Sequence, residues 1–422
     1  MELLTIAVVS VLKGIVAIVS VFLVCIVLHE FGHYIVAKKS GVAVPAFAVG
    51  FGPKIFRWTR NGTEFSIRLF PLGGLVQLAG EIPQDALFRK GEQIAFQVDD
   101  QGRVTVLGDP MDVPGGRVGI LRDLDLMNRL QMTIDTGDEV RNYTVVPHAK
   151  LMTNKRNSMP LVERHEQVLG KPLWQRAAII LAGPAMNFLL AGVLFSAWSG
   201  YNGVPTTQVA TVASGSPAAM SGLQTGDKVL AVDGKTISSW TDLQRAIRAD
   251  HSTPPKPLRL DIERNKTTEH ITVTPRMVDG NIPQLGVTPQ LSHNVLQAVK
   301  TGFANVYFGS VNAVQAYWQV ISQHQFNSLA GPVGIADVIN QQAQTGFWHV
   351  VMIAGLLSLN LGLFNLLPIP ALDGGRLLFM IVEMFRGRAV DPRKEGLVHL
   401  VGFGLLMLFA VVITYRDVTR LF

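Results

Sequence analysis

The stretch GIVAIVSVFLVCIVLHEFGH, residues 14–33, joins an uncharged apolar run to the motif His29-Glu30-Phe31-Gly32-His33. Side chains four residues apart lie on the same face of a helix, so both imidazoles point the same way. Such a pair can hold a zinc ion, and the glutamate between them can take a proton from water. The motif therefore predicts a zinc-dependent hydrolytic site, with His29 and His33 as ligands and Glu30 as the base.

The apolar run predicts that this site lies inside a membrane. Residues 14–28 carry no charge, and Lys13 and Lys38-Lys39 stand at the two ends of the span. A helix rises about 1.5 Å per residue, so a segment of this length crosses a hydrocarbon core of about 30 Å. An acidic side chain at that depth costs roughly 2.5–3.5 kcal/mol on insertion scales. We therefore expect Glu30 to have a function there.

The composition agrees with a membrane protein that carries extramembrane parts. Of the 422 residues, 48% are hydrophobic and 16% are charged, and the mean hydropathy is +0.29. The net charge of +6 is spread over several loops, without a basic patch interleaved with aromatic residues, so nucleic-acid binding is not expected. The N-terminus has Glu2 and no basic cluster, which favours a membrane anchor over a cleaved signal peptide.

Cys25 is the single cysteine, so no internal disulfide can form. It precedes His29 by one helical turn and has two interpretations, a group that approaches the metal or a small apolar residue of the membrane helix. The second is favoured, because free cysteine behaves as a small hydrophobe.

Residues 40–85 are predicted to form a membrane-associated, re-entrant β region. Alternating side chains run from Ile55 to Arg60 and again from Phe65 to Leu69, with Asn61-Gly62 between the two runs. Asn-Gly in that position is a strong signal for a β-hairpin, because both turn residues need positive φ. The hairpin would offer a free edge to an extended peptide. The alternative is a hairpin that only packs on the cytoplasmic mouth of the protein.

The next two segments are predicted to be a domain and a second span. Residues 86–171 are polar and predict a small cytoplasmic β-rich insert, with a hairpin over Gln93–Leu107. Residues 172–200 contain the uncharged run Ala177–Trp198, in which Gly183-Pro184 is expected to kink the helix. Asn187 is a costly polar group in lipid, so we expect it to face the interior of the bundle.

Residues 204–277 are predicted to form a soluble recognition domain. Strands are expected at Lys228–Val232, Leu258–Glu263 and His270–Thr274, with a helix at Trp240–Ala249. No residue in this domain suggests catalysis. This arrangement resembles a bacterial PDZ domain, and the resemblance implies recognition of extended peptides by strand addition.

Residues 290–348 mix apolar and polar side chains at helical spacing. Leu296–Ser322 predicts an amphipathic helix on the outer leaflet, with a soluble helix as the alternative. Leu329–Ile335 is expected to bend the chain ahead of the next apolar run.

A third span, within residues 349–386, contains the other notable polar group. The chain is uncharged from Val350 to Leu372, and Pro368 and Pro370 break any regular helix directly before Asp373. An intramembrane aspartate needs a partner, and a zinc ion held by two histidines lacks its third ligand. Asp373 is therefore predicted as that ligand; the alternative is a cap for the helix that follows.

Basic residues set the predicted orientation. They cluster after span one, before span two and after span three, which predicts that these loops lie in the cytoplasm. A fourth span, Leu397–Thr414, returns the C-terminus to the outside. By this orientation the two histidines and Asp373 lie near the cytoplasmic side, and the recognition domain lies on the opposite side.

The predicted fold is a polytopic α-helical membrane protein with about four transmembrane helices, a membrane-associated β-hairpin region and one extracytoplasmic α+β domain. The predicted parts are a first transmembrane helix with HExxH (1–39), the re-entrant β region (40–85), the cytoplasmic insert (86–171), a second transmembrane helix (172–200), the recognition domain (204–277), the amphipathic helix and linker (290–348), a third transmembrane helix with the Leu-Asp-Gly motif (349–386) and a fourth transmembrane helix (396–416).

These motifs together resemble the site-2 intramembrane zinc metalloproteases, in particular their bacterial PDZ-containing branch. The matching pieces are His29–His33, Gly183–Phe188, a PDZ-like stretch within 204–277, and Asn365–Gly374, in the family's order and over most of the chain. A single PDZ domain and a long cytoplasmic insert look like Gram-positive members. Gram-negative relatives often carry two PDZ domains, so strict periplasmic filtering does not carry over directly.

The resemblance implies a bound Zn²⁺ with His29, His33 and Asp373 as ligands and Glu30 as general base. It also implies that the β region engages substrate.

The resemblance further implies that Asn365, with Pro368 and Pro370 behind it, helps to hold the substrate strand. Asn187 is a further predicted substrate contact.

The family role is the second cut in regulated intramembrane proteolysis. The implied substrates are single-spanning membrane proteins already trimmed by a site-1 protease, such as anti-sigma factors or signal-peptide remnants. The implied location is the bacterial plasma membrane, in contact with lipid.

Two other function classes compete with this interpretation. A non-catalytic adaptor would bind partners through the PDZ-like domain, but it would have no need for costly intramembrane charges. A metal transporter would need further intramembrane ligands on spans two and four, where the sequence offers only His399, near the start of span four.

Overall fold

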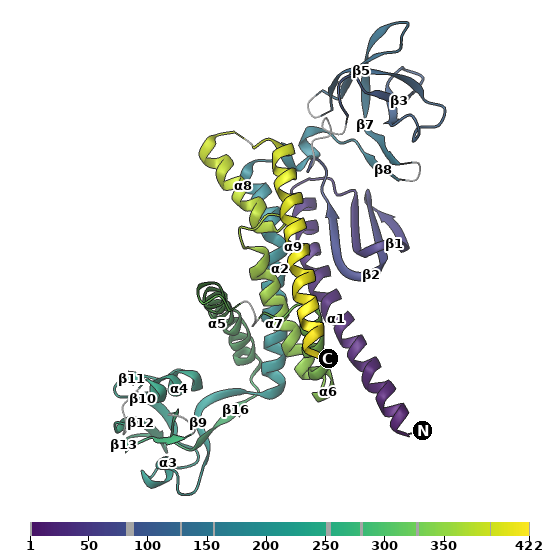
Figure 1. Cartoon of the computed structure of the whole chain (residues 1–422). Coiled ribbons are helices and arrows are strands. Elements are labelled where there is room, and N and C mark those ends of the chain that lie inside the picture. The colour runs from purple at the N-terminus through teal and green to yellow at the C-terminus, as the bar shows by residue number, and fades with distance from the viewer. Residues whose placement is uncertain are drawn as a thin grey trace. The chain divides into compact units, whose positions relative to one another are not determined.

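The computed structural model describes residues 2–81, 88–126, 129–154, 157–249, 255–278, 282–325, 329–388 and 390–421. The chain divides into two compact units. One is formed by Met1–Ala191 with Phe308–Phe422, and the other by Gly192–Tyr307. Figure 1 labels the elements of both.

Four helices of the described chain are long and apolar enough to cross a membrane. They are α1 (Glu2–Lys39), α2 (Leu173–Asn202), α7 (Phe347–Asn365) and α9 (Pro392–Leu421). The four predicted spans fall on these four helices. α2 runs without interruption through Pro184.

The third span is shorter than the apolar run that encodes it. α7 ends at Asn365, and residues 366–372 are not helical before α8 (Asp373–Arg386) begins. Pro368 and Pro370 have no N–H to donate and clash with the preceding turn, which is why a helix cannot continue here. The backbone therefore opens ahead of Asp373, as the sequence predicts.

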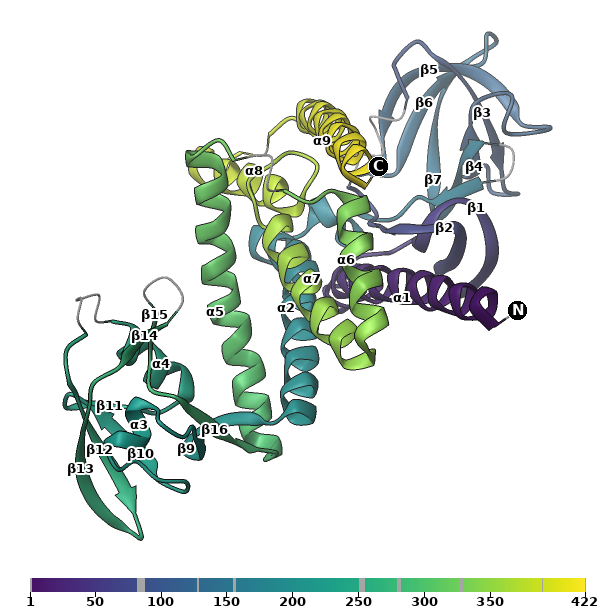
Figure 2. The same ribbon diagram turned by 60° about the horizontal axis from the view of Figure 1, so that its bottom comes forward.

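The segment before α7 contains two helices, of which the sequence predicts one. α5 (Val295–Ser322) covers the predicted amphipathic helix, and α6 (Pro332–Thr345) lies where only a bend and a linker are expected. Gly331-Pro332 still turns the chain, but it does so as the first residues of a helix. α6 packs against α1, α7 and α9 (Figures 1 and 2).

β1 (Ala46–Arg60) and β2 (Thr63–Gln77) form the predicted hairpin. Its turn residues Asn61 and Gly62 have φ of +48° and +75°, as an Asn-Gly turn requires. β2 then folds back, because Ala46 pairs with both Glu64 and Gln77. The start of β1 therefore lies between two segments of β2, and the later segment, residues 74–77, is an outer strand.

A β-rich insert follows the hairpin, as predicted. Its strands are β3 (Gln93–Val98), β4 (Val104–Gly108), β5 (Arg117–Asp125), β6 (Gln131–Asp135), β7 (Val140–Asn154) and β8 (Asn157–Pro160), and short 3-10 helices η2 (Arg164–Glu166) and η3 (Val168–Gly170) lead to α2. The strand order is β4-β3-β5-β6-β7-β8, and a further pairing of β4 with β7 closes a barrel. Ile94, Phe96, Leu121 and Ile134 are fully buried in its core.

The second unit contains an antiparallel sheet with the order β13-β12-β10-β9-β16. Its elements are β9 (Val204–Val212), α3 (Pro217–Met220), β10 (Lys228–Val232), β11 (Lys235–Thr236), α4 (Trp240–Arg248), β12 (Leu258–Arg264), β13 (Thr267–Val273), β14 (Arg276–Val278), β15 (Ile282–Gln284) and β16 (Val287–Ser292). α4 begins where predicted, because the Ser239 hydroxyl accepts from the Asp242 N–H at 3.1 Å. Leu243, Leu260 and Ile262 pack in the core.

Candidate metal centre

α1 brings its two motif histidines together on one face. His29 and His33 are one helical turn apart, and their Nε2 atoms lie 3.2 Å from each other. His29 is buried and His33 is partly buried, so both imidazoles are largely removed from the surface. This is the face that the spacing of the motif predicts.

Asp373 reaches the same point from the first residue of α8. Its Oδ2 lies 3.3 Å from His29 Nε2 and 3.4 Å from His33 Nε2. Among the residues that the structure describes, these three form the group of side chains able to hold a metal ion, with ligand atoms within 4.8 Å of one another. The 366–372 loop makes this meeting possible by ending α7 short of Asp373.

The two imidazoles are oriented by partners on α2. His33 Nδ1 lies 2.8 Å from the carbonyl oxygen of Ile179, so Nδ1 carries a hydrogen and Nε2 is free to bind a metal. His29 Nδ1 lies 3.1 Å from the side-chain amide of Asn187, which is fully buried. α7 supports Asn187 in turn, because the Ser358 hydroxyl donates to the Asn187 carbonyl oxygen at 2.9 Å.

These residues fit a zinc ion. Asp373 Oδ2 is buried without a hydrogen-bond partner, although it faces two imidazole nitrogens. Such an arrangement costs free energy unless a cation lies between the groups. Two imidazoles and one carboxylate are a set found at catalytic zinc sites, where a fourth position stays open.

Glu30 lies beside this group and under β2. The Val76 N–H donates to its carboxylate, and a Cβ added at Gly74 would overlap the Glu30 side chain. Residues 74–77 therefore pass directly over the motif. A glycine at position 74 allows this close approach.

The residues predicted to contact substrate differ in their neighbours and in their burial. The Asn365 amide donates to Leu361 of its own helix at 3.0 Å, Pro368 is exposed, and Pro370 is half-buried in the loop. Asn187 contacts His29, as described. The substrate roles of these four residues stay predictions.

Cys25 is buried and points toward α7, where its Sγ lies 3.8 Å from the Ala354 carbonyl oxygen. This supports its interpretation as a small residue within the membrane helix.

The sequence does not reveal the groups that hold the ligands. The Ile179 carbonyl has no side-chain signal, and its position depends on how α2 packs against α1. The sequence shows a glycine at position 183, but only the structure shows why it is needed there. A Cβ at this position would overlap His33 Nε2 and lie 2.8 Å from His29 Cε1. His399, on α9, accepts the Ala371 N–H of the loop. In the sequence, the one indication that His399 has a role is that it is a histidine within an apolar span.

Known proteins resemble the chain over nearly its full length. Residues 17–409 match the profile of Peptidase family M50. The zinc metalloprotease RasP of Geobacillus kaustophilus is 38% identical over 423 residues, which cover 98% of this chain and 100% of the relative. The regulator of sigma-W protease RasP of Bacillus subtilis is 34% identical, covering 97% of this chain and 99% of the relative.

Solved structures match a part of the chain. The PDZ domain of an SdrC-like protein from Listeria monocytogenes is 20% identical, and the match covers 20% of this chain and 87% of that domain with a TM-score of 0.18.

Proposed function

Because the chain belongs to peptidase family M50 and is a zinc metalloprotease, we propose that it cleaves single-spanning membrane proteins within their transmembrane segments. The observation that carries this proposal is the meeting of His29, His33 and Asp373 at the end of an apolar helix. Glu30 lies beside them, with the two histidines and Asp373 as charged neighbours and the Val76 N–H as a donor to its carboxylate. A metal centre that a membrane helix presents fits a substrate that is itself in the membrane.

The roles of the residues follow from their chemistry. A zinc ion held by three protein ligands activates water near neutral pH and polarises the scissile carbonyl. Glu30 takes the proton from the attacking water and returns it to the leaving amine. His29, His33 and Asp373 hold the ion, and the Ile179 carbonyl and the Asn187 amide fix the two imidazoles.

The substrate must be extended at the point of cleavage. In a helical transmembrane segment the carbonyls are bonded internally, so the helix has to unwind before one of them can be attacked. We infer that the substrate pairs with the outer β2 segment, residues 74–77, which lies over Glu30. New backbone hydrogen bonds would offset those lost on unwinding. Asn365, Pro368 and Pro370 would lie on the other side of that strand.

The biological role that we propose is the second cut in regulated intramembrane proteolysis. The name of the Bacillus subtilis relative, a regulator of sigma-W protease, supports an anti-sigma-factor-like substrate. In this proposal a site-1 protease first trims the substrate outside the cell. The PDZ domain, on the extracytoplasmic side of a multi-pass protein in the bacterial plasma membrane, then admits trimmed substrates.

The test is cleavage of a transmembrane substrate by the purified chain in detergent, with Glu30→Gln as the decisive variant. We expect Glu30→Gln to abolish cleavage while zinc content stays near that of the wild type, because the amide keeps the shape but cannot take a proton. Glu139→Gln, at an exposed carboxylate of the insert, is the matched control and should cleave normally. Activity of Glu30→Gln within about tenfold of wild type would refute its role as the base.

A further inference from the structure

The loop that carries Asp373 is bonded locally except at Ala371. Within residues 366–372, Pro368 and Pro370 have no N–H, and the N–H groups of Leu366, Leu367, Ile369 and Leu372 bond to carbonyls two or three residues earlier. Ala371 has φ of +77°, a left-handed conformation that is unfavourable for a non-glycine residue. Something outside the loop must therefore favour this conformation.

The external bond comes from α9. The Ala371 N–H donates to His399 Nδ1 at 2.8 Å, across 28 residues of sequence. Because Nδ1 accepts, the hydrogen of the neutral ring is on Nε2, a buried atom that makes no hydrogen bond and lies 3.9 Å from Glu395 Oε1 on the preceding turn of α9. A histidine in an apolar span is costly, and the bond to the loop, together with the neighbouring Glu395 carboxylate, offsets that cost.

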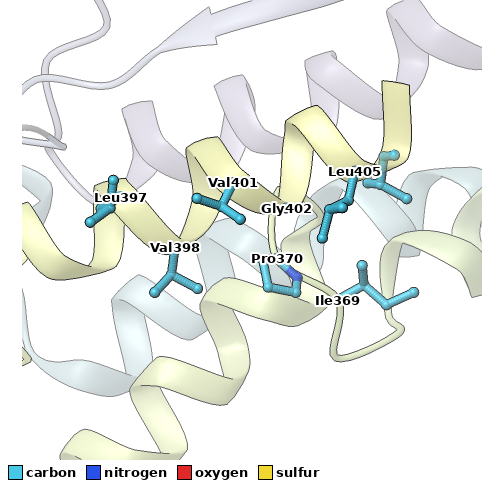
Figure 3. Close-up of a pocket in the computed structure, with 8 residues that line it drawn as sticks. Ile369, Pro370, Leu397, Val398, Val401, Gly402 and Leu405 are labelled. Carbon is cyan, nitrogen blue, oxygen red and sulfur yellow. The ribbon is translucent and has the colours of Figure 1, made fainter. Parts of the chain in front are cut away.

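The same face of α9 approaches the loop closely. Gly402 lies three residues after His399, and a Cβ there would overlap Pro370 Cβ and lie 2.9 Å from the Pro370 carbonyl oxygen. Pro370 and Gly402 both line an apolar groove of about 430 Å³ between the loop and α9. Figure 3 shows Pro370 beside Gly402. The close approach of Gly402 fixes Pro370, and the hydrogen bond to His399 fixes Ala371. These two residues come just before Leu372 and Asp373.

We propose that His399 is a positioning residue of the metal centre, which holds the 366–372 loop so that Asp373 Oδ2 faces His29 and His33. This inference rests on the proposed function, because it assigns Asp373 to the zinc site. His399 itself binds no metal in this proposal. It acts through the backbone of Ala371, and Gly402 lets α9 come near enough for that bond.

The first test uses two substitutions of His399 in the full chain, purified in detergent. His399→Leu removes the acceptor, and His399→Asn keeps one, because an amide oxygen can occupy about the position of Nδ1. Zinc affinity is measured by competition with a chelator, and cleavage is measured alongside. We expect His399→Leu to weaken zinc binding by about tenfold or more, and His399→Asn to remain close to wild type.

The second test leaves the imidazole in place and moves the helix. Gly402→Ala should weaken zinc binding, since the added methyl group pushes α9 away from Pro370. Gly404→Ala is the matched control, because nothing lies within 4 Å of a Cβ at that position on the same helix. This pair keeps the proposal testable if His399→Leu fails to fold.

Three results would overturn the proposal. They are unchanged zinc affinity in His399→Leu, equal losses in His399→Leu and His399→Asn, or equal behaviour of Gly402→Ala and Gly404→Ala. If the wild type binds zinc and cleaves the substrate, any of these results refutes only the role of His399 and leaves the proposed function standing. A wild type that binds no zinc refutes the proposed function, and this inference with it.

Discussion

Each histidine of the metal centre uses both of its ring nitrogens. His33 donates from Nδ1 to the Ile179 carbonyl, which leaves Nε2 with its lone pair toward Asp373. His29 needs the same tautomer, so its Nδ1–H should meet an acceptor. The nearby Asn187 amide supplies one if its oxygen faces His29, and Asn187 Oδ1 is otherwise buried without a partner. Turning the amide by 180° gives both the His29 Nδ1–H and the Asn187 Oδ1 a partner, so we infer that the oxygen faces His29.

This arrangement predicts the effect of Asn187→Ala. Loss of the amide frees the His29 ring to turn, so zinc affinity should fall by about 10- to 100-fold, measured by chelator competition. Asn202→Ala is the control, because Asn202 is exposed on the same helix and bonds only to Trp198 of its own turn. Unchanged zinc affinity with a raised KM would contradict the positioning role. It would support the direct substrate contact that the sequence predicts for Asn187.

At the residue scale, the sequence was sufficient to predict that His29, His33 and Asp373 lie together, but not which groups support them. His29, Glu30 and His33 are adjacent in one helix, and Asp373 follows a segment that two prolines keep from being helical. Asn187 was expected to face inward, because lipid disfavours an amide. Its partner, however, depends on the rotation of α2 against α1, which no local pattern encodes.

At the scale of elements, small residues set how near the helices come. α2 passes so close to the histidines that there is no room for a side chain at position 183. On α1, a Cβ at Gly32 would overlap the Ala182 carbonyl oxygen. Small residues at such contacts are how membrane helices pack closely. The Gly183-Pro184 pair was expected to kink α2. In the structure, the glycine of this pair allows α2 to pass close to His29 and His33.

Gly183→Ala tests this packing. Alanine favours helix over glycine, so α2 itself should not weaken, but the methyl group would displace His33 Nε2. We expect a loss of zinc occupancy, measured by metal analysis, and a destabilisation of about 1–3 kcal/mol from overpacking. Gly200→Ala, on the same helix, meets only an ordinary contact of 3.7 Å with Ala298 and should keep its zinc. Normal zinc content in Gly183→Ala would show that the helices separate easily.

The helix that the sequence did not predict, α6, shows the limit of periodicity. Its polar residues interrupt the apolar pattern, and its first turn has no side-chain cap of its own because Gly331 stands at the N-cap position. The cap comes from α9, where the Asp417 carboxylate accepts the N–H groups of Gly331 and Gly334 at 2.8 and 2.9 Å. A cap supplied from 83 or more residues away is invisible to local sequence patterns.

At the scale of the whole molecule, the basic residues near the four spans carry the prediction of orientation. Reporter fusions that are active only outside the cytoplasm should give signal at Ser238, in the second unit, and none at Gly102, in the insert. The opposite pattern would overturn the orientation, and with it the proposal that the metal centre lies near the cytoplasmic side. Equal signal at both positions would contradict an alternating set of four spans.

The central claim is that His29, His33 and Asp373 together hold a zinc ion in this chain. Zinc-edge X-ray absorption of the purified chain in detergent tests it most directly. We predict two imidazole nitrogens and one carboxylate oxygen at about 2.0–2.2 Å, no sulfur, and a clear loss of zinc in Asp373→Ala. A sulfur at about 2.3 Å, the zinc distance to a thiolate such as that of Cys25, or the same coordination in Asp373→Ala as in the wild type, would contradict the account.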